Sequence, residues 1–173
     1  QFQLKRKFNE SEFYIFYNMG GSYTQVSLVE FSEVKNENNT KVLGHNINIL
    51  GEVWDKTLGG HYFDKNLIKV FMDKFDNLPQ RKGKKSIKEN KKVFEKMVPH
   101  SIKCKEVLSA NKDSYIAILN VDNSMNLEGT ITREEFINAN EELLSKVYLP
   151  IQKLLNNDEF NDYFTEINEF LKS

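Results

Sequence analysis

The amino-acid sequence predicts a mixed α and β fold (α/β), because its hydrophobic periodicity changes along the chain. Residues 13–53 are rich in aromatic and β-branched side chains that alternate with polar ones, as in half-buried strands. Residues 63–75 carry apolar side chains at helical spacing, and residues 114–131 return to a strand pattern. The remainder is helical and ends in an amphipathic segment at 160–171. This order predicts a three-stranded meander, helices, a small hairpin and further helices.

The composition indicates a folded domain and limits its partners. Of 173 residues, 39% are hydrophobic and 28% are charged, which suffices for a buried core. Because the formal net charge is −1, we expect neither nucleic acid nor an anionic membrane as the main partner. No apolar run approaches the roughly 18 residues that a membrane-spanning helix needs. The start has neither an initiator Met nor a signal peptide, so we expect a piece of a longer protein.

Two strand-like runs flank a pair of glycines near the start of the chain. The first covers residues 12–17 and the second covers residues 23–34. Because Gly20 and Gly21 lie between them, the pattern predicts an antiparallel hairpin. Alternation resumes at residues 42–53, where we expect the third strand of the sheet.

Helices are predicted in the middle of the chain. The first covers residues 63–75 and ends near Pro79; the second covers residues 93–108, where Pro99 should kink the helix or begin it. The Lys-rich segment between them is the least core-like part of the sequence. Within it, residues 81–85 could contact an anion, although a solvated basic loop is the simpler interpretation.

A second hairpin and another helix are expected after residue 113. Strands at 114–121 and 125–131 can pair with each other. Thr132 and Glu135 then have the spacing of a capping box, in which each side chain satisfies a backbone N–H at the start of a helix. We expect this helix to continue until Pro150 bends its end.

Two glycine-containing turns could bind phosphate. The turn at Gly20 and Gly21 lets backbone N–H groups face an oxyanion at close range. A second turn, ending at Gly60, precedes a predicted helix and could present that helix's N-terminal N–H groups. An ordinary hairpin turn and an ordinary strand-to-helix turn are the alternatives.

Two arrangements have some features of a metal site, but no metal ligand is predicted. Residues 124–135 resemble a calcium-binding loop, but Ser124 stands where an Asp is required and the preceding segment has strand periodicity. His100 and Cys104 would share a helix face but have no second pair of ligands, so a surface His and a packed Cys are the simpler interpretation. Calcium binding at 124–135 is kept as the weakest alternative.

Four short motifs follow one another between about residues 13 and 155. They read Phe16-Tyr17-Asn18-Met19-Gly20-Gly21-Ser22, Asp55-Lys56-Thr57-Leu58-Gly59-Gly60-His61-Tyr62-Phe63-Asp64, Lys105-Glu106-Val107-Leu108-Ser109 and Ile131-Thr132-Arg133-x-x-Phe136. In this order they resemble the heat shock protein 70 (Hsp70) family, which has Asp-Leu-Gly-Gly-Gly-Thr, Asp-x-x-Leu-Gly-Gly-x-x-Phe-Asp, Lys-Arg-x-Leu-Ser and Ile-Thr-Arg-x-x-Phe. The resemblance implies the actin-like ATPase fold, which is ribonuclease H-like.

Within that family, the chain is similar to lobe II of the nucleotide-binding domain in the large, divergent 170-kDa glucose-regulated branch. This implies an inner subdomain of residues 1–77 and 132–173 and an outer subdomain of residues 78–131. It also implies a chaperone of the endoplasmic reticulum lumen, with the cytoplasm as the alternative. Its partners would be unfolded clients and an ordinary Hsp70, for which the parent protein would act in nucleotide exchange.

The resemblance also assigns nucleotide-binding roles to five residues. Gly20 and Gly21 would hold the β- and γ-phosphates of ATP or ADP, and Gly60 would lie close to the nucleotide. Lys105 and Ser109 would contact its ribose and adenine side. Magnesium would accompany the nucleotide in the full-length parent.

Four departures from the family pattern bear on catalysis. Asn18 replaces the Asp that helps to position magnesium-bound water, so no catalytic residue is expected. Tyr23 replaces a Thr that contacts the γ-phosphate, while Glu106 and Ile102 replace an adenine-stacking Arg and an adenosine-contacting Glu. The resemblance therefore implies at most a weak ATPase in the parent, inactivity in the isolated chain, and ATP as a conformational ligand. The alternative is a protein-docking module with a vestigial nucleotide site.

Overall fold

The computed structural model describes residues 11–38 and 41–157 of the chain, which divide into two compact units. Of the described residues, unit 1 combines 11–38 and 41–58 with 147–157, and unit 2 is the continuous segment 59–146. The strands and helices alternate as the sequence predicts, so the mixed α and β fold is confirmed. None of the helices in the described ranges has the length and apolar character needed to cross a membrane.

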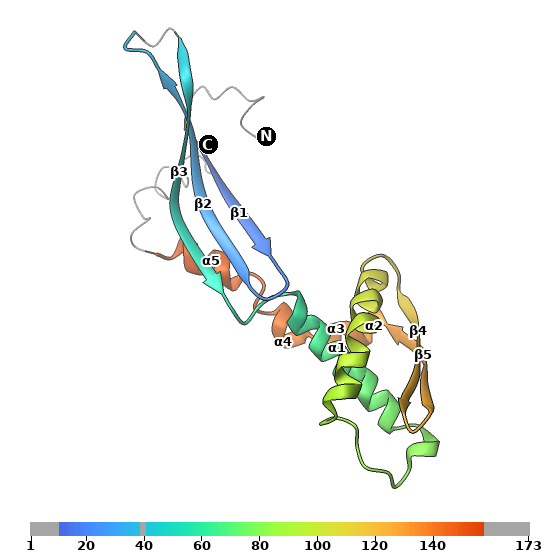
Figure 1. Cartoon of the computed structure of the whole chain (residues 1–173). Coiled ribbons are helices and arrows are strands. Elements are labelled where there is room, and N and C mark those ends of the chain that lie inside the picture. The colour runs from blue at the N-terminus through green and yellow to red at the C-terminus, as the bar shows by residue number, and fades with distance from the viewer. Residues whose placement is uncertain (1–10, 39–40, 158–173) are drawn as a thin grey trace. The chain divides into compact units, whose positions relative to one another are not determined.

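Unit 1 is built on the predicted three-stranded meander (Figure 1). Strands β1 (Glu12–Met19), β2 (Thr24–Lys35) and β3 (Val42–Asp55) pair antiparallel in the order β1-β2-β3. Helix α5 (Leu149–Leu155) packs against β2 and β3. All three strands begin within a residue of their predicted positions and extend one or two residues further than predicted.

The core of unit 1 lies between the sheet and α5. Val26 and Leu28 alternate along β2 and are buried against Leu154 of the helix. The Tyr17 hydroxyl on β1 donates a hydrogen bond of 2.9 Å to the carbonyl oxygen of Val147, just before α5. Burial raises the pKa of this phenol, and a nearby carboxylate adds to the effect despite a hydrogen bond with Thr24. The helix that closes this core is therefore contributed by a segment far away in the sequence.

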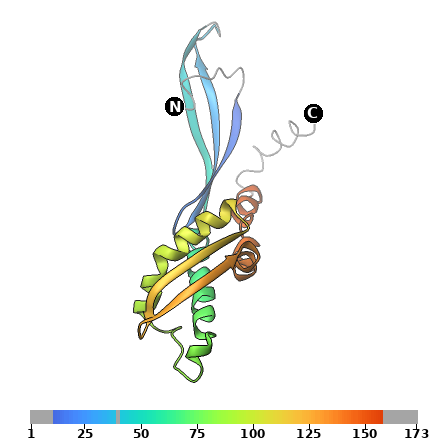
Figure 2. The same cartoon turned by 90° about the vertical axis from the view of Figure 1, so that its right-hand side faces the viewer.

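Unit 2 packs helices against a two-stranded hairpin. Figure 2 shows the hairpin alongside α2. In chain order its elements are α1 (Gly60–Asp76), a short 3₁₀ helix η2 (Pro79–Arg81), α2 (Lys91–Ala110), β4 (Asp113–Asp122), β5 (Met125–Thr132), α3 (Arg133–Ala139) and α4 (Glu141–Leu144). The hairpin confirms the predicted pairing of β4 with β5.

One continuous hydrophobic cluster fills unit 2. Phe71 and Phe75 of α1 and Met97 of α2 are completely buried, together with Ile118 of β4 and Ile131 of β5. The strand residues come from the inward-facing positions of β4 and β5, which alternate with exposed ones. Each of these four elements thus contributes one apolar face to the same core.

The helix predicted after Thr132 is shorter than expected. The capping box is confirmed, since the Thr132 hydroxyl accepts from the Glu135 N–H at 3.1 Å and the Glu135 carboxylate accepts from the Thr132 N–H at 2.9 Å. However, α3 stops at Asn140, whose side-chain amide donates to the Phe136 carbonyl at 2.9 Å. The apolar spacing continues across this break into α4 and then α5, where Pro150 lies near the start of the last helix. The prediction of one continuous helix was therefore wrong.

Pro99 lies inside α2 and does not begin it. The helix starts at Lys91, where the Asn90 side chain accepts hydrogen bonds from the N–H groups of Lys92 and Val93. The amphipathic helix predicted at 160–171 lies outside the described residues. The division into subdomains at residues 78 and 131 stays a prediction.

Candidate functional site

The glycine turn between β1 and β2 forms the predicted hairpin. Met19 and Thr24 are its last paired residues, and the Gly20 N–H donates to the Tyr23 carbonyl oxygen at 2.9 Å. Gly20 has no left-handed backbone angle, and a Cβ atom added there would lie 3.4 Å from that oxygen, an ordinary contact. The local backbone therefore does not require glycine at position 20.

The residues beside this turn are exposed and largely aromatic. Asn18 is exposed near the end of β1, where it pairs with Gln25. Tyr23 is 41% exposed, and its ring lies 5.4 Å from the Trp54 ring, centroid to centroid. Buried Thr24 donates its hydroxyl to the Leu58 carbonyl oxygen at 2.9 Å, which joins the hairpin to the segment that follows β3. The turn is thus held from one side while Asn18 and Tyr23 face solvent.

The N-terminus of α1 has no side-chain cap. The helix begins at Gly60 after Gly59, whose backbone is extended, and its first turn contains no acidic residue. The Tyr62 N–H bonds back to the Gly59 carbonyl oxygen at 3.0 Å. Because the first N–H groups of a helix lack intrahelical acceptors, this end carries a partial positive charge suited to an anion.

Lys105 of α2 reaches this end of α1. Its ammonium nitrogen lies 2.6 Å from Oδ1 of Asp64 and donates to the Gly60 carbonyl oxygen at 3.2 Å. The Asp64 side chain is only 7% exposed, and His61 Nδ1 lies 3.9 Å from its other oxygen. Two of the predicted nucleotide-binding residues, Gly60 and Lys105, are therefore in direct contact.

Ser109 lies one turn beyond Lys105 on α2 and is exposed. Its hydroxyl donates to the Glu106 carbonyl oxygen at 2.6 Å. The end of this helix is held by Arg133, whose Nε donates to the Leu108 carbonyl oxygen at 3.0 Å and whose terminal nitrogen reaches the Ser109 carbonyl oxygen at 3.5 Å. Because a cation is favourable at a helix C-terminus, Arg133 fixes the turn that carries Ser109.

Three of the four sequence motifs meet in unit 2. The Phe63 and Phe136 rings stack with their centroids 6.3 Å apart, while Asp64 pairs with Lys105 and Arg133 holds the end of α2. Of the five predicted site residues, Gly60, Lys105 and Ser109 belong to unit 2, and Gly20 and Gly21 belong to unit 1.

Sequence reasoning gave no role to Asp64, although it is the last residue of a recognised motif. It also interpreted Arg81 as part of a solvated loop, which was wrong. The Arg81 side chain is 2% exposed; it pairs with Asp76 at 3.1 Å and with Asp122, and it lies over the Phe75 ring at 4.9 Å. The sequence did offer one signal that Arg81 is special: this Lys-rich chain contains only three arginines.

The geometry supports neither the calcium loop at 124–135 nor a metal site at His100 and Cys104. Residues 125–132 form β5, so the helix–loop–helix arrangement of a calcium loop is absent there, and Glu135 bonds to Thr132 and Lys74. Across residues 11–38 and 41–157, no three His, Cys, Asp or Glu side chains converge on a metal position. Cys104 is packed in the core, where burial raises its pKa despite a hydrogen bond with Ser114.

The mixed α and β fold and these linked motifs fit the actin-like ATPase fold, and the chain belongs to the Hsp70 family of chaperones. A sequence model of that family, described as Hsp70 protein, matches residues 4–171. The chain is a divergent member that resembles the 170-kDa glucose-regulated type, because several relatives are named hypoxia up-regulated protein 1.

Three relatives illustrate the relationship. Hypoxia up-regulated protein 1 of Xenopus tropicalis is 28% identical over 145 residues, which cover 84% of this chain and 22% of the relative. A heat shock protein homolog of Candida glabrata is 32% identical over 109 residues, which cover 63% of this chain and 15% of the relative. Heat shock 70 kDa protein 17 of Arabidopsis thaliana is 29% identical over 157 residues, covering 90% and 18%. The chain thus spans less than a quarter of each relative's length.

Proposed function

We propose that the chain is lobe II of the nucleotide-binding domain of a large Hsp70-family chaperone, and that it contributes half of an ATP or ADP site. The observation that carries this proposal is the placement of Lys105 on the first turn of α1, beside Gly60. Membership of the Hsp70 family supports it, since nucleotide binding is general in that family. Residues 1–77 with 132–173 would be the inner subdomain, and residues 78–131 the outer one.

Each predicted residue has a chemical task in this proposal. An ammonium group has three N–H donors, so Lys105 retains one for a ribose hydroxyl after its contacts with Gly60 and Asp64. Ser109, exposed one turn further along α2, would face the adenine side. Gly20 and Gly21 would let backbone N–H groups approach the β- and γ-phosphates. This role would account for the glycine at position 20, which the local backbone does not require.

ATP would act as a conformational ligand in the parent protein. Asn18 is neutral where the family has an acidic residue, so it cannot orient magnesium-bound water by charge. Magnesium would enter with the nucleotide phosphates in the full-length parent, and lobe I would supply the remaining polar groups. A ligand that binds both lobes favours the closed state by its differential affinity for that state.

The parent's cellular role is proposed from its relatives. Several are named hypoxia up-regulated protein 1, and others are named heat shock protein homologs. We infer a chaperone of the endoplasmic reticulum lumen that binds unfolded clients and serves an ordinary Hsp70 in nucleotide exchange. The cytoplasm is the alternative location.

Calorimetry with ATP and ADP on the isolated chain tests the nucleotide site. We expect weak binding, with a dissociation constant of about 10 µM to 1 mM, and no steady release of phosphate. Gly20→Ala should weaken binding without unfolding the chain, because its Cβ makes only an ordinary contact. Gly44→Ala is the matched control, since a Cβ there meets nothing within 4 Å. No detectable binding, or equal affinities of the two variants, would contradict the proposal; sub-micromolar affinity or turnover would contradict the conformational role.

The second candidate is a protein-docking module whose nucleotide site is vestigial. It is favoured by Asn18 and Glu106, which remove the family's acidic and adenine-stacking groups. Replacing Gly20 and Gly21 by valine in the full-length protein separates the two functions. Exchange activity that survives these changes supports the docking module, whereas its loss supports nucleotide binding.

A further inference from the structure

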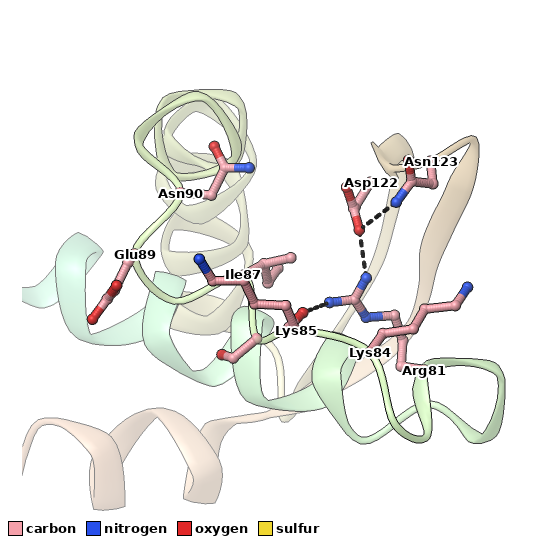
Figure 3. A pocket seen from close by; sticks show the side chains of 9 residues that line it. Arg81, Lys84, Lys85, Ile87, Glu89, Asn90, Asp122 and Asn123 are labelled. Atoms are coloured by element: carbon pink, nitrogen blue, oxygen red, sulfur yellow. Dashed lines mark hydrogen bonds and ion pairs between the residues drawn. The ribbon is translucent and has the colours of Figure 1, made fainter.

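A basic cavity lies in unit 2, at the end of the hairpin and the start of α2 (Figure 3). It has a volume of about 580 Å³ and is lined by the loop after α1, by the Asn90 cap of α2, and by Asp122 and Asn123 of the hairpin turn. None of its lining residues is aromatic. Every part of the wall belongs to the same compact unit.

The wall is held in place by Arg81. Its buried guanidinium pairs with Asp76 at the end of α1 and with Asp122 at the end of β4, and it donates to the Lys85 carbonyl oxygen. Asp76 also accepts from the N–H of Ile87 at 3.2 Å. Three separate segments are thus joined through one side chain. The cavity is therefore formed before any ligand arrives, which reduces the ordering cost of binding.

The charge of the cavity comes from lysines that have no carboxylate partner in the described part of the chain. The two carboxylates beside Arg81 outweigh its single positive charge, so this cluster adds no positive field. Lys84 reaches only the sulfur of Met125, at 3.4 Å, and Lys85 makes no ion pair in the described ranges. In Figure 3 these two lysines extend on opposite sides of Arg81.

The surrounding segment strengthens this field. Residues 81–92 contain seven basic residues and one acidic residue, Glu89, whereas the whole chain has a net charge of −1. Glu89 also lines the cavity; in Figure 3 it lies on the side toward which Lys85 extends, and its carboxylate points away from Arg81 and Lys84. Lys88 is held by Asp73, outside the cavity wall. The excess positive charge therefore remains at Lys84 and Lys85.

The separation of the two ammonium groups indicates the class of ligand. One phosphate group would bind most favourably where donors converge on a single point, but Lys84 and Lys85 diverge. Two diverging ammonium groups can each contact a different carboxylate of an extended peptide, and the Asn90 amide nitrogen, which donates to no group in the described part, can meet a peptide carbonyl. Base stacking, which single-stranded nucleic acids require, has no aromatic platform here.

From these observations we propose that the cavity binds an acidic peptide segment of a partner protein, with Lys84 and Lys85 each contacting one carboxylate. This site is independent of the proposed nucleotide site. It would give the predicted outer subdomain, residues 78–131, a docking function of its own.

Fluorescence anisotropy of the whole chain with a fluorescein-labelled hexaglutamate peptide tests the proposal. We expect measurable binding that falls steeply with added salt, because exposed charges are screened. Lys84→Gln combined with Lys85→Gln should weaken binding by about tenfold. The matched control is Lys103→Gln combined with Lys112→Gln, which removes the same charge from exposed positions outside the cavity and should change affinity less than about twofold.

A second variant distinguishes loss of charge from loss of folding. Lys84→Arg combined with Lys85→Arg keeps both charges and should retain binding, and thermal unfolding followed by circular dichroism should be unchanged in every variant. The proposal is overturned if the unaltered chain does not bind the peptide, or if the control variant loses as much affinity. It is also overturned if inorganic phosphate at low millimolar concentration displaces the peptide, or if an oligonucleotide or anionic vesicle binds more tightly through the same lysines.

Discussion

Lys105 of α2 forms an ion pair of 2.6 Å with the buried Asp64 of α1. These residues come from two motifs that are far apart in sequence, and their contact fixes the start of α1 against the C-terminal part of α2. Because the Asp64 side chain is nearly excluded from water, this ion pair compensates for the cost of burying its carboxylate.

Removing the lysine should therefore destabilise unit 2. We expect Lys105→Met to lower the free energy of unfolding by about 2 kcal/mol, less than for a fully buried pair because Lys105 is partly exposed. Adding Asp64→Asn should recover part of this loss, and urea denaturation of both single variants and the double variant measures the coupling. Lys103→Met, at an exposed position of the same helix, is the control; an equal loss there would disprove the dependence on Asp64.

Arg81 should be among the most sensitive positions of unit 2. Arg81→Met would leave Asp76 and Asp122 close together without their cation, and we expect a loss of about 3 kcal/mol in unfolding free energy. Hydrogen exchange of residues 82–90 should accelerate, since Arg81 also holds the Lys85 carbonyl. Lys82→Met, at a neighbouring exposed position, should change neither quantity.

The capping box of α3 should make stability depend on pH. Partial burial by itself would raise the pKa of Glu135, but the Lys74 ammonium at 2.6 Å and the Thr132 N–H outweigh it and lower the pKa below its ordinary value of 4.5. A lowered pKa adds stability above the ordinary value, and this stability is lost as pH falls through the lowered one.

Glu135→Gln should therefore lower the unfolding free energy at neutral pH by about 0.5–1 kcal/mol. The difference from the unaltered chain should shrink as the pH falls below 4.5. Denaturant unfolding over a series of pH values measures this trend. A difference that stays constant with pH would show that the charge of Glu135 contributes nothing.

Pro99 should reduce the stability of α2. It lies exposed inside the helix, where it lacks the N–H that would bond to the preceding turn. Pro99→Ala should raise the unfolding free energy by about 1–2 kcal/mol, because the gain of about 3 kcal/mol in the helix is reduced by the greater freedom of the unfolded chain. Denaturant unfolding of the variant and of the unaltered chain measures the gain. The comparison requires that the substitution does not displace Ser101, which is buried two residues later.

Local patterns predicted most of the secondary structure. Alternating side chains predicted β1, β2 and β3, and the Thr132 and Glu135 spacing predicted the capping box, because these features depend on neighbouring residues. The break at Asn140 was missed because apolar spacing continues through it. At the break, the Asn140 N–H bonds to the Ile137 carbonyl oxygen, and the Asn140 side-chain amide takes the Phe136 carbonyl oxygen.

The candidate site was predictable only in part, for a similar reason. The motif resemblance named Gly60, Lys105 and Ser109, and the structure brings the first two into contact. Contacts between distant residues leave no periodic trace, so the pairing of Asp64 with Lys105 could not be predicted from spacing. Spacing also could not predict the burial of Arg81, because its partner Asp122 lies 41 residues away in sequence.

The division of the chain has a consequence for its synthesis. Unit 2 is one uninterrupted segment, whereas unit 1 needs α5 to cover Val26 and Leu28. On the ribosome, β1, β2 and β3 emerge first but must wait for Leu154 to complete their core. The nascent polypeptide can therefore finish the later-encoded unit before the earlier one, and a translational pause before α5 would prolong exposure of the waiting strands to other chaperones.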